Sequence, residues 1–360
     1  MRIALVSDVY LPRLGGIEMH VHDLAIQLQR AGHAVTVFTT TPSDSPATDV
    51  PVLRLPVVAG VPTSVEALRL ALGSGEYDVV HAHTSFFSPL AWTATRIAAD
   101  CGVPAVITLH SLPANGDVLL PRLRARVSPH AQWTGVSKVV TERLQRVAPA
   151  EVLHNGIDPQ GWRLPQQAHR PLTIVSTMRL TRRKRPGALL HVLRAVRNSI
   201  PAEIPLRAVL IGAGPRAAAT ARSARRLGPE WVELPGRLTR FEIQQLYTSA
   251  DVYLAPAELE SFGVAALEAR CAGLPVIAMA SGGVGEFVRE GREGYLVGSH
   301  QEMAAVAADL LTDLPRLRKL QAHNRSTDPT MTWPTVIDQH VALYTVTQPA
   351  LSAGYLPSRA

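Results

Sequence analysis

The chain has 360 residues, 46% of them apolar and 18% charged, a composition that excludes a disordered protein and indicates a soluble globular one. This length suits two domains of ordinary size better than a single core. No apolar run reaches the roughly 18 residues of a membrane span. The opening residues, MRIALVSDVYLP, are typical of a buried strand rather than a signal peptide, so we expect a cytoplasmic protein whose two cysteines are reduced.

The net charge of +7 lies entirely in the second half of the chain. Residues 1–165 hold 13 basic and 13 acidic side chains, whereas residues 166–360 hold 23 and 16. A basic half can attract an anionic ligand or a membrane surface, and a solvated basic surface is the plainer alternative. Arginine outnumbers lysine 33 to 3, so counts of arginine alone carry little information. No nucleic-acid partner is expected.

The first half alternates short apolar runs with helical stretches. A strand is predicted at Ile3–Ser7, and a loop containing Gly15-Gly16 leads into a helix from Ile17 to Ala31 that Gly32 ends. The next strand is Val35–Thr39. Further strands are predicted at Val52–Leu55, Val79–His81, Ala105–Leu109, Trp133–Val136 and Glu151–Leu153.

Residues 157–171 are polar, contain prolines and lack periodicity, which predicts a linker. After it come a strand at Thr173–Thr177, a helix at Gly187–Ser199, a strand at Arg207–Ile211 and a turn at 212–215. Later strands are predicted at Val232–Leu234, Val252–Ala255, Pro275–Ala278 and Tyr295–Val297. Helices follow near 301–323 and 333–346, and residues 350–360 are predicted to be a frayed tail.

This alternation predicts an α/β protein with two doubly wound units and mainly parallel sheets. We expect a first domain at 1–160, a second at 171–330, and a final segment at 331–360. Ligands of such sheets bind beyond the carboxyl ends of the strands. Two units facing each other would therefore place their strand-end motifs at a common cleft.

The most informative motif is ESFGVAALE, in which Glu260 and Glu268 bracket a predicted helix start at Ser261-Phe262-Gly263. A glycine there lets a ligand approach the backbone, and free N–H groups at a helix start favour anions. Carboxylates accept hydrogen bonds from paired hydroxyls, such as those of a ribose or a hexose. A solvated acidic face is the alternative, but the glycine and the preceding strand favour a site for a nucleotide-sugar.

Arg179 and Lys184 flank the loop after the first strand of the second unit. A guanidinium and an ammonium that converge on a diphosphate would neutralise a leaving group without a metal. A solvated basic loop is the alternative, and the neighbouring Arg182, Arg183 and Arg185 are expected at the surface.

Two candidate features of the first unit also follow strands. His110 ends the strand AVITLH, where it could donate to a sugar hydroxyl or serve only in packing. Gly15 and Gly16 could admit a phosphate or sugar, although a Gly-Gly turn taken alone is more often just a tight connection. His81 and His83 share a face of one strand, but no third ligand with suitable spacing is evident, so a metal site is not expected.

Residues 119–127 place Leu119, Leu123 and Val127 on one stripe, flanked by Arg122 and Arg126. Such a basic amphipathic segment could make peripheral contact with an anionic membrane. A core-facing helix explains the same stripe and is preferred, because the first half is neutral overall.

Together these motifs resemble the family 4 retaining glycosyltransferases of GT-B architecture, the group that includes phosphatidylinositol mannosyltransferases. The resemblance runs through nearly the whole chain and rests on these segments: GGIEMHVHDLAIQLQRAGHAVTVFT, DVVHAH, TLHS, HNGID, the R-x4-K loop, GAGP, ESFGVAALEARCAGLPVIA, GGVGEFV and GYLV. It implies two Rossmann-like domains facing a cleft, with a C-terminal helix that crosses back to the first domain.

The resemblance also implies a role for each matched position. Arg179 and Lys184 would hold the diphosphate, Glu268 the ribose hydroxyls, and Glu260 would lie near the donor sugar. His110 would contact that sugar near the reacting carbon. The remaining donor-binding positions are the backbone N–H groups of Phe262, Gly263 and Val264, the base-reading loop at Arg237, and the space left by Gly15 and Gly16.

The implied reaction is transfer of a hexosyl or N-acetylhexosaminyl group from a UDP- or GDP-sugar to an acceptor hydroxyl, with retention and with no metal or other cofactor. The acceptor, whether a glycan, a lipid-linked sugar or a small molecule, stays open. Arg185-Pro186 departs from the family pattern, which has glycine after the lysine. The alternatives are a nonhydrolysing sugar-nucleotide epimerase, a non-catalytic sensor on the same scaffold and, less favoured, a dehydrogenase, since G-x-G-x-x-G is absent.

Overall fold

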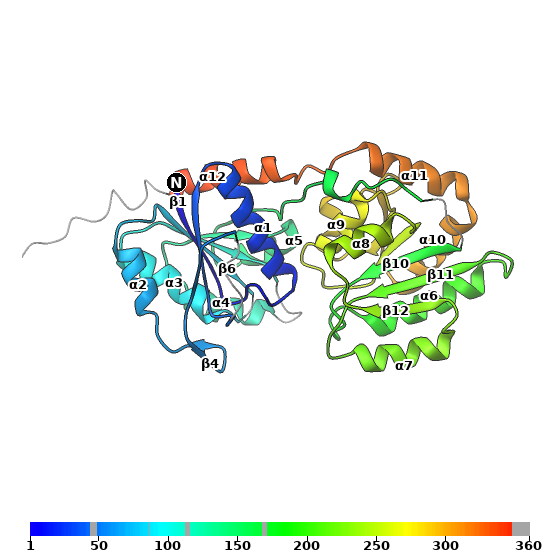
Figure 1. Ribbon diagram of the computed structural model, residues 1–360, viewed down its shortest axis with the longest axis horizontal. Coiled ribbons are helices and arrows are strands. Elements are labelled where there is room, and N and C mark those ends of the chain that lie inside the picture. The colour runs from blue at the N-terminus through cyan, green and yellow to red at the C-terminus, as the bar shows by residue number, and fades with distance from the viewer. Residues whose placement is uncertain (44–48, 86, 112–115, 168–170, 348–360) are drawn as a thin grey trace, which may run out of the picture. The chain divides into compact units, whose positions relative to one another are not determined.

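The computed structural model describes residues 1–43, 49–85, 87–111, 116–167 and 171–347. The chain divides into two compact units (Figure 1). Unit 1 contains Met1–Gly156 together with the segment that begins at Trp333, and unit 2 contains Ile157–Thr332. The predicted tail at 350–360 lies outside the described residues.

Unit 1 is built on a seven-stranded parallel sheet in the order β3-β2-β1-β6-β7-β8-β9. Its strands are β1 (Arg2–Ser7), β2 (Ala34–Thr39), β3 (Val52–Arg54), β6 (Val79–Thr84), β7 (Ala105–Leu109), β8 (Gln132–Gly135) and β9 (Ala150–Val152). Its helices are α1 (Gly16–Arg30), α2 (Glu66–Gly73), α3 (Pro89–Asp100), α4 (Leu120–Arg124), α5 (Lys138–Leu144) and α12 (Trp333–Thr347). A small antiparallel pair, β4 (Val57–Val58) and β5 (Val61–Pro62), lies apart from the sheet.

Unit 2 has a six-stranded parallel sheet in the order β12-β11-β10-β13-β14-β15. Its strands are β10 (Leu172–Thr177), β11 (Leu206–Ile211), β12 (Val232–Gly236), β13 (Val252–Ala255), β14 (Val276–Met279) and β15 (Gly294–Val297). Its helices are α6 (Pro186–Ser199), α7 (Ala217–Leu227), α8 (Arg240–Tyr247), α9 (Val264–Cys271), α10 (His300–Thr312) and α11 (Leu314–Ser326). The described residues also contain short 3₁₀ turns at Gly116–Val118, Gln160–Trp162 and Gly283–Glu286.

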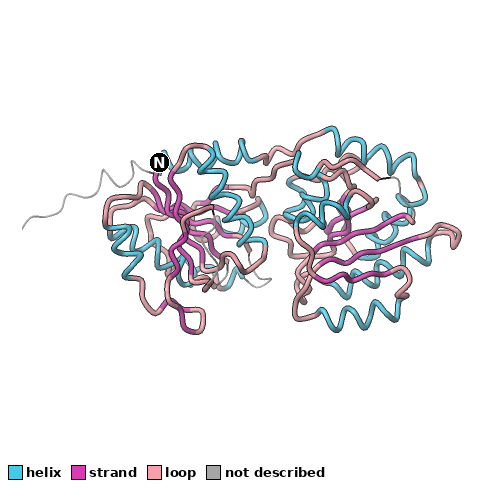
Figure 2. The backbone as a smooth tube through the Cα atoms, viewed as in Figure 1, coloured by secondary structure: helices cyan, strands magenta, loops and turns pink. Residues whose placement is uncertain are grey.

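Both sheets are doubly wound, as the alternating pattern predicts. Apolar runs such as β1 and β7 are buried on both faces, because helices cover both sides of a parallel sheet. In unit 2, α6 and α7 lie on one side of the strands and α8 and α9 on the other (Figure 1), and Figure 2 shows the strands side by side. The direction of winding reverses between β1 and β6 in unit 1 and between β10 and β13 in unit 2, which are the switch points where such folds bind ligands.

The predicted elements are confirmed, with boundary shifts of a few residues. Strand β6 extends to Thr84 rather than ending at His81, because the buried polar side chains of its end find hydrogen-bond partners inside the unit. The helix expected near 301–323 is two helices. Asp313 separates them and caps α11 by accepting a hydrogen bond from the backbone N–H of Arg316 at 3.0 Å, and Pro315 cannot continue the preceding helix.

Helix α12 completes the core of unit 1. Trp333, at its start, packs on Gly156, where a β-carbon would lie only 2.3 Å from the indole. Tyr344 is fully buried, and its hydroxyl lies 2.7 Å from Nδ1 of His81 on β6. The last helix of the described residues therefore shares a core with strands from the beginning of the chain.

The turn at 212–215 packs against the loop that carries Arg179. Gly212 has a φ of 137°, and a β-carbon there would lie 1.9 Å from the carbonyl oxygen of Met178. The backbone N–H of Leu180 donates to the carbonyl of Ala213 at 2.9 Å. Because the two segments touch through backbone atoms, only glycine fits at position 212.

Gly212→Ala is therefore expected to lower the free energy of unfolding by more than about 1 kcal/mol, since alanine is strained at this φ and collides with Met178. Urea unfolding measures the effect. The matched control is Gly187→Ala, at an exposed position inside α6 with no atom within 4 Å of the added carbon. It should be neutral or stabilising by up to about 1 kcal/mol. Equal stability of the Gly212 variant and the wild type would contradict this account.

Candidate functional site

The end of β10 is anchored by two buried tyrosines that follow it in sequence. The Tyr253 hydroxyl donates to the carbonyl of Thr177 at 2.9 Å, and the Tyr247 hydroxyl lies 2.8 Å from Thr177 Oγ1. Burial raises the pKa of Tyr253 well above its ordinary value, and the carboxylates of Glu260 and Glu268 raise it further. Both glutamates therefore affect the same hydroxyl, that of Tyr253, near the switch point of unit 2. Sequence analysis missed these tyrosines, because a tyrosine in an apolar run is typical of a core.

Lys184 forms an ion pair with Glu260, which joins the loop after β10 to the loop after β13. The side chains of both residues are partly buried. The backbone of Glu260 is fixed as well, because its carbonyl accepts a hydrogen bond from the N–H of Gly283 at 2.8 Å. The predicted cation and the predicted carboxylate thus contact each other directly.

Two of the neighbouring arginines expected at the surface also bind the 258–261 loop; Arg185 is exposed as expected, whereas Arg183 is only partly exposed. Arg183 donates to the carbonyl of Leu259 at 2.9 Å and to Ser261 Oγ at 3.1 Å, and Arg185 donates to Glu258 Oε2 at 2.8 Å. Arg185 has a φ of 58°, a left-handed conformation that favours glycine. This conformation explains why glycine suits the position after the lysine.

Glu260 and Glu268 bracket a helix start, as the sequence pattern predicts. Helix α9 begins at Val264, so Glu260 belongs to the preceding loop and Glu268 to the helix. Gly263 precedes the helix with a φ of 96°, which ends the loop sharply. Phe262 is buried and packs on Phe287 at 5.6 Å between ring centroids. The first-turn N–H groups of α9 have no partner within the helix, as at any helix start.

Arg179 and Arg237 are exposed at the carboxyl ends of their strands. Arg179 follows β10, and no ion pair or hydrogen bond joins its side chain to the part of the chain that the structure describes. Arg237 follows Gly236, the last residue of β12. Arg179 is therefore close in sequence to Lys184, whereas Arg237 follows a strand that lies two positions from β10 in the sheet.

In unit 1, five buried histidines gather behind the switch point: His20, His81, His83, His110 and His340. His83 Nδ1 and His110 Nε2 lie 3.0 Å apart, and His81 Nε2 lies 2.6 Å from Thr108 Oγ1. Burial lowers the pKa of all five imidazoles, to about 3 for His110 and about 4 for His340. All five rings are therefore neutral at pH 7.

The expectation that no third ligand accompanies His83 is wrong. Nitrogens of His20, His83 and His110 lie within 4.8 Å of one another, while His81 turns instead to Tyr344. Three nitrogens on one tetrahedral zinc would lie about 3.4 Å apart, since zinc–nitrogen bonds are about 2.0–2.1 Å. A hydrogen bond already joins two of the three rings. The set as it stands is a hydrogen-bonded cluster rather than a formed metal site.

Gly15 and Gly16 lie at the start of α1. Gly15 is its N-cap, and a β-carbon there would come within 2.5 Å of Glu18 Oε2, whereas one at Gly16 would meet nothing within 4 Å. Glu18 is buried and pairs with Arg13 at 2.8 Å. The lack of a side chain at Gly15 therefore makes room for this carboxylate, a local reason that sequence analysis did not supply.

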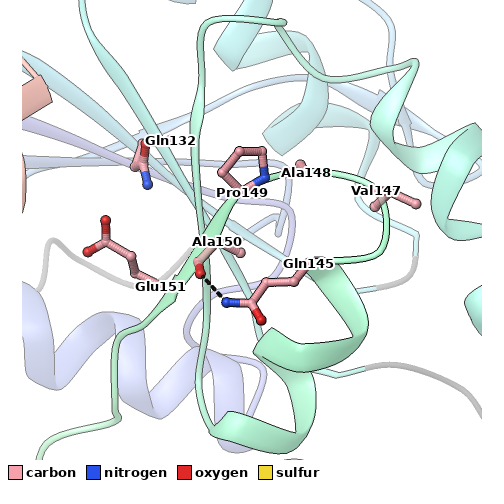
Figure 3. A pocket seen from close by; sticks show the side chains of 7 residues that line it. All are labelled: Gln132, Gln145, Val147, Ala148, Pro149, Ala150 and Glu151. Atoms are coloured by element: carbon pink, nitrogen blue, oxygen red, sulfur yellow. Dashed lines mark hydrogen bonds between the residues drawn. The ribbon is translucent and has the colours of Figure 1, made fainter.

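Two further features lie away from the strand-end residues. The stripe at 119–127 faces the core, because Leu123 and Val127 are buried, and Arg126 stacks on Trp92 at 5.4 Å while Arg122 stays exposed. The core-facing interpretation is thus confirmed for Leu123 and Val127, whereas the helix itself ends at Arg124 and Leu119 is only partly buried. Figure 3 shows a hollow beside Gln132 and Ala150, the first residues of β8 and β9, in which Gln145 donates to the Ala150 carbonyl at 2.9 Å. It lies at the amino ends of the strands, where doubly wound sheets do not bind ligands.

No helix in the described segments is long and apolar enough to cross a membrane.

Comparison with known proteins matches both units. A family model described as Glycosyltransferase Family 4 matches residues 14–160, and one described as Glycosyl transferases group 1 matches residues 164–327. The chain is 30% identical over 365 residues to D-inositol 3-phosphate glycosyltransferase of Rhodococcus erythropolis, covering 86% of this chain and 81% of that protein. It is 28% identical to D-inositol 3-phosphate glycosyltransferase 1 of Catenulispora acidiphila, with 95% of each chain covered.

Solved structures show the same fold. Sucrose-phosphate synthase of Thermosynechococcus elongatus has a TM-score of 0.78 at 20% identity, with 97% of this chain and 99% of that chain covered. HepE of Anabaena, solved in complex with UDP-glucose, has a TM-score of 0.75 at 18% identity, with 96% and 100% covered.

The buried histidines predict that unit 1 loses stability in acid. Their folded-state pKa values lie below the ordinary 6.5, so the unfolded chain binds protons that the folded unit cannot. This stability is complete above about pH 7 and falls below about pH 6.5, by about 1.4 kcal/mol per pH unit for each histidine. Melting temperatures from pH 8 to 5 measure the slope. His340→Phe should flatten it and the exposed control His130→Gln should not; a pH-independent melting temperature would contradict the prediction.

Proposed function

This chain belongs to the family 4 glycosyltransferases and has their GT-B fold, and on that premise we propose that it transfers a sugar from a UDP- or GDP-sugar to an acceptor hydroxyl, with retention and without a metal. Membership alone makes it an enzyme that uses a nucleotide-sugar donor. It also sets aside the epimerase and sensor alternatives. The observation that carries the finer proposal is the Lys184–Glu260 pair at the switch point of unit 2, with Arg179 exposed in the same loop.

The donor diphosphate is proposed to bind Arg179 and Lys184. Arg179 is exposed, so binding a phosphate does not require it to leave a partner among the described residues. Lys184 already points to a carboxylate, and Glu260 therefore holds the ammonium in place before a phosphate arrives. An ammonium held by Glu260 and an accessible guanidinium would together stabilise a departing diphosphate.

The nucleoside and sugar are proposed to lie along α9. Backbone N–H groups at Phe262, Gly263 and Val264 would meet the phosphate and sugar, because a helix start attracts anions. Glu268 would accept hydrogen bonds from the ribose hydroxyls and Glu260 would lie near the donor sugar. Arg237, after β12, would belong to the loop that contacts the base through its backbone.

By the family resemblance, residues of unit 1 act on the same donor. His110 would contact the sugar near the reacting carbon, and its neutral ring can donate a single hydrogen bond there. Gly15 and Gly16 would leave room for the diphosphate and the sugar, and the open surroundings of Gly16 support this part of the proposal.

The proposed reaction proceeds on one face of the sugar. The bond from the anomeric carbon to the diphosphate breaks as the acceptor hydroxyl approaches, through an oxocarbenium-like state. An oxygen of the leaving phosphate takes the proton of the acceptor. The protein then has two tasks, which are to hold both substrates in reacting geometry and to stabilise the leaving charge.

The acceptor follows from the proposal only as a class, a molecule with a nucleophilic hydroxyl. The relatives are named for D-inositol 3-phosphate, which makes that compound the first acceptor to test. The basic excess of the second half suits an anionic substrate.

Arg179→Ala and Lys184→Ala are each expected to lower kcat by about 100-fold or more, since each removes a preorganised charge from the leaving group. The donor is first identified by a thermal-shift screen of UDP- and GDP-sugars, because a ligand of the native state raises Tm. The matched control is Arg182→Ala, an exposed cation of the same loop, which should keep wild-type turnover. Near wild-type kinetics in both Arg179→Ala and Lys184→Ala would refute the proposed site.

Metal independence predicts that transfer survives complete chelation. The protein is dialysed against EDTA and assayed with the identified donor, and kcat should stay unchanged because side-chain cations serve the diphosphate. Loss of activity with EDTA and recovery with a divalent ion would contradict this part of the proposal. Arg179→Ala then provides a second test, since a metal-dependent enzyme would lose less activity from that variant.

A further inference from the structure

Strands β6 and β7 bring two histidines into contact behind the switch point of unit 1. His83 pairs in register with Thr108, and the backbone N–H of His110 donates to the carbonyl of Thr84 at 2.9 Å. This register places His83 Nδ1 3.0 Å from His110 Nε2. Both rings are buried, with exposed fractions of 1% and 7%. The contact is therefore a buried hydrogen bond that water does not replace.

A neutral imidazole has one N–H and one bare nitrogen, so this bond allows only two arrangements. Burial lowers the pKa of both rings, which keeps both neutral at pH 7. In the first arrangement His83 donates from Nδ1, so that His110 accepts at Nε2 and carries its proton on Nδ1. In the second, His110 donates from Nε2 and its Nδ1 is bare.

The other nitrogen of His83 distinguishes the two arrangements. His83 Nε2 is fully buried and has no hydrogen-bond partner among the described residues. In the second arrangement this atom would be a buried N–H without an acceptor, whereas in the first it is a bare nitrogen. Orphaned buried N–H groups are rarer in proteins than under-satisfied acceptors. The orphan atom therefore favours donation by His83.

We propose that His83 is a positioning residue, which donates its Nδ1–H to His110 Nε2 and thereby fixes His110 as the Nδ1–H tautomer. The inference rests on the proposed function for its consequence, because the Nδ1–H of His110 is then the donor offered to the sugar. No hydrogen bond joins His110 Nδ1 to the described residues, so that proton is not already engaged. In the opposite tautomer, Nδ1 of His110 would present a lone pair to the sugar hydroxyl, or to the negative charge that develops on the substrate during the reaction.

The tautomer is measured directly by NMR. Long-range correlation of ring protons with ¹⁵N in histidine-labelled protein at pH 7.5, after dialysis against EDTA, distinguishes a protonated from a bare nitrogen. His110→Gln assigns the resonances of His110. The expected result in the wild type is protonation of His110 at Nδ1. Protonation at Nε2 would overturn the proposal, and neither result depends on turnover.

Variants of His83 test the cause. In His83→Asn the amide N–H₂ takes the place of Nδ1–H, so His110 should keep its tautomer and most of kcat. In His83→Phe the donor is lost, and we expect a change of tautomer and a fall in kcat of roughly 10–100-fold, the range for losing a group that orients a functional histidine. KM for the donor should change little. His81→Asn is the matched control, a buried histidine of the same strand that bonds to Tyr344 and Thr108 instead.

A purely structural role of His83 would lower Tm in both His83 variants without changing the tautomer of His110 and without rescue by asparagine. An unchanged Nδ1–H tautomer in His83→Phe would therefore overturn the proposal. If His83→Phe does not fold, the tautomer of His110 in the wild type and the kcat of His83→Asn still test the proposal. Absence of any transferase activity in the wild type would defeat the proposed function, while the tautomer measurement would stand by itself.

Discussion

Lys184 and Glu260 lie on loops that leave neighbouring strands at the point where the sheet of unit 2 reverses its winding, and their ion pair joins these loops. The attraction works because neither charge is fully solvated. It orients the ammonium, and Arg183 and Arg185 hold the backbone and side chains of the same carboxylate loop. The result is a rigid platform of positive charge next to the start of α9.

Uncharged groups hold the loops of this platform in place. Tyr247 and Tyr253 fix Thr177 at the end of β10, and Gly212 lets the next turn touch the backbone of Met178. The position of Arg179 therefore depends on the packing of three other segments against the end of β10. Unit 1 uses a comparable principle with other residues, since several of its buried histidines and threonines form hydrogen bonds with one another near the strand ends.

The sequence was sufficient to predict both sheets, because buried parallel strands appear as short apolar runs between helices. It also pointed to the residues at the switch point of unit 2, since a pattern such as E-x7-E with a nearby glycine is local. Local spacing could not give the exact first residue of that helix, which the left-handed conformation of Gly263 sets at Val264. Nor could it pair Arg183 with Leu259 or His83 with His110, which are joined by strand register over long stretches of chain.

The placement of Trp333 against Gly156 has a consequence for synthesis of the protein. Unit 1 is discontinuous, and α12 is made only after the whole of unit 2 has been translated. Until then the nascent chain exposes the apolar surface that Trp333 and Tyr344 cover, while unit 2 can already fold. The core of unit 1 can therefore close only after α12 has emerged from the ribosome, although most of that unit is synthesised first.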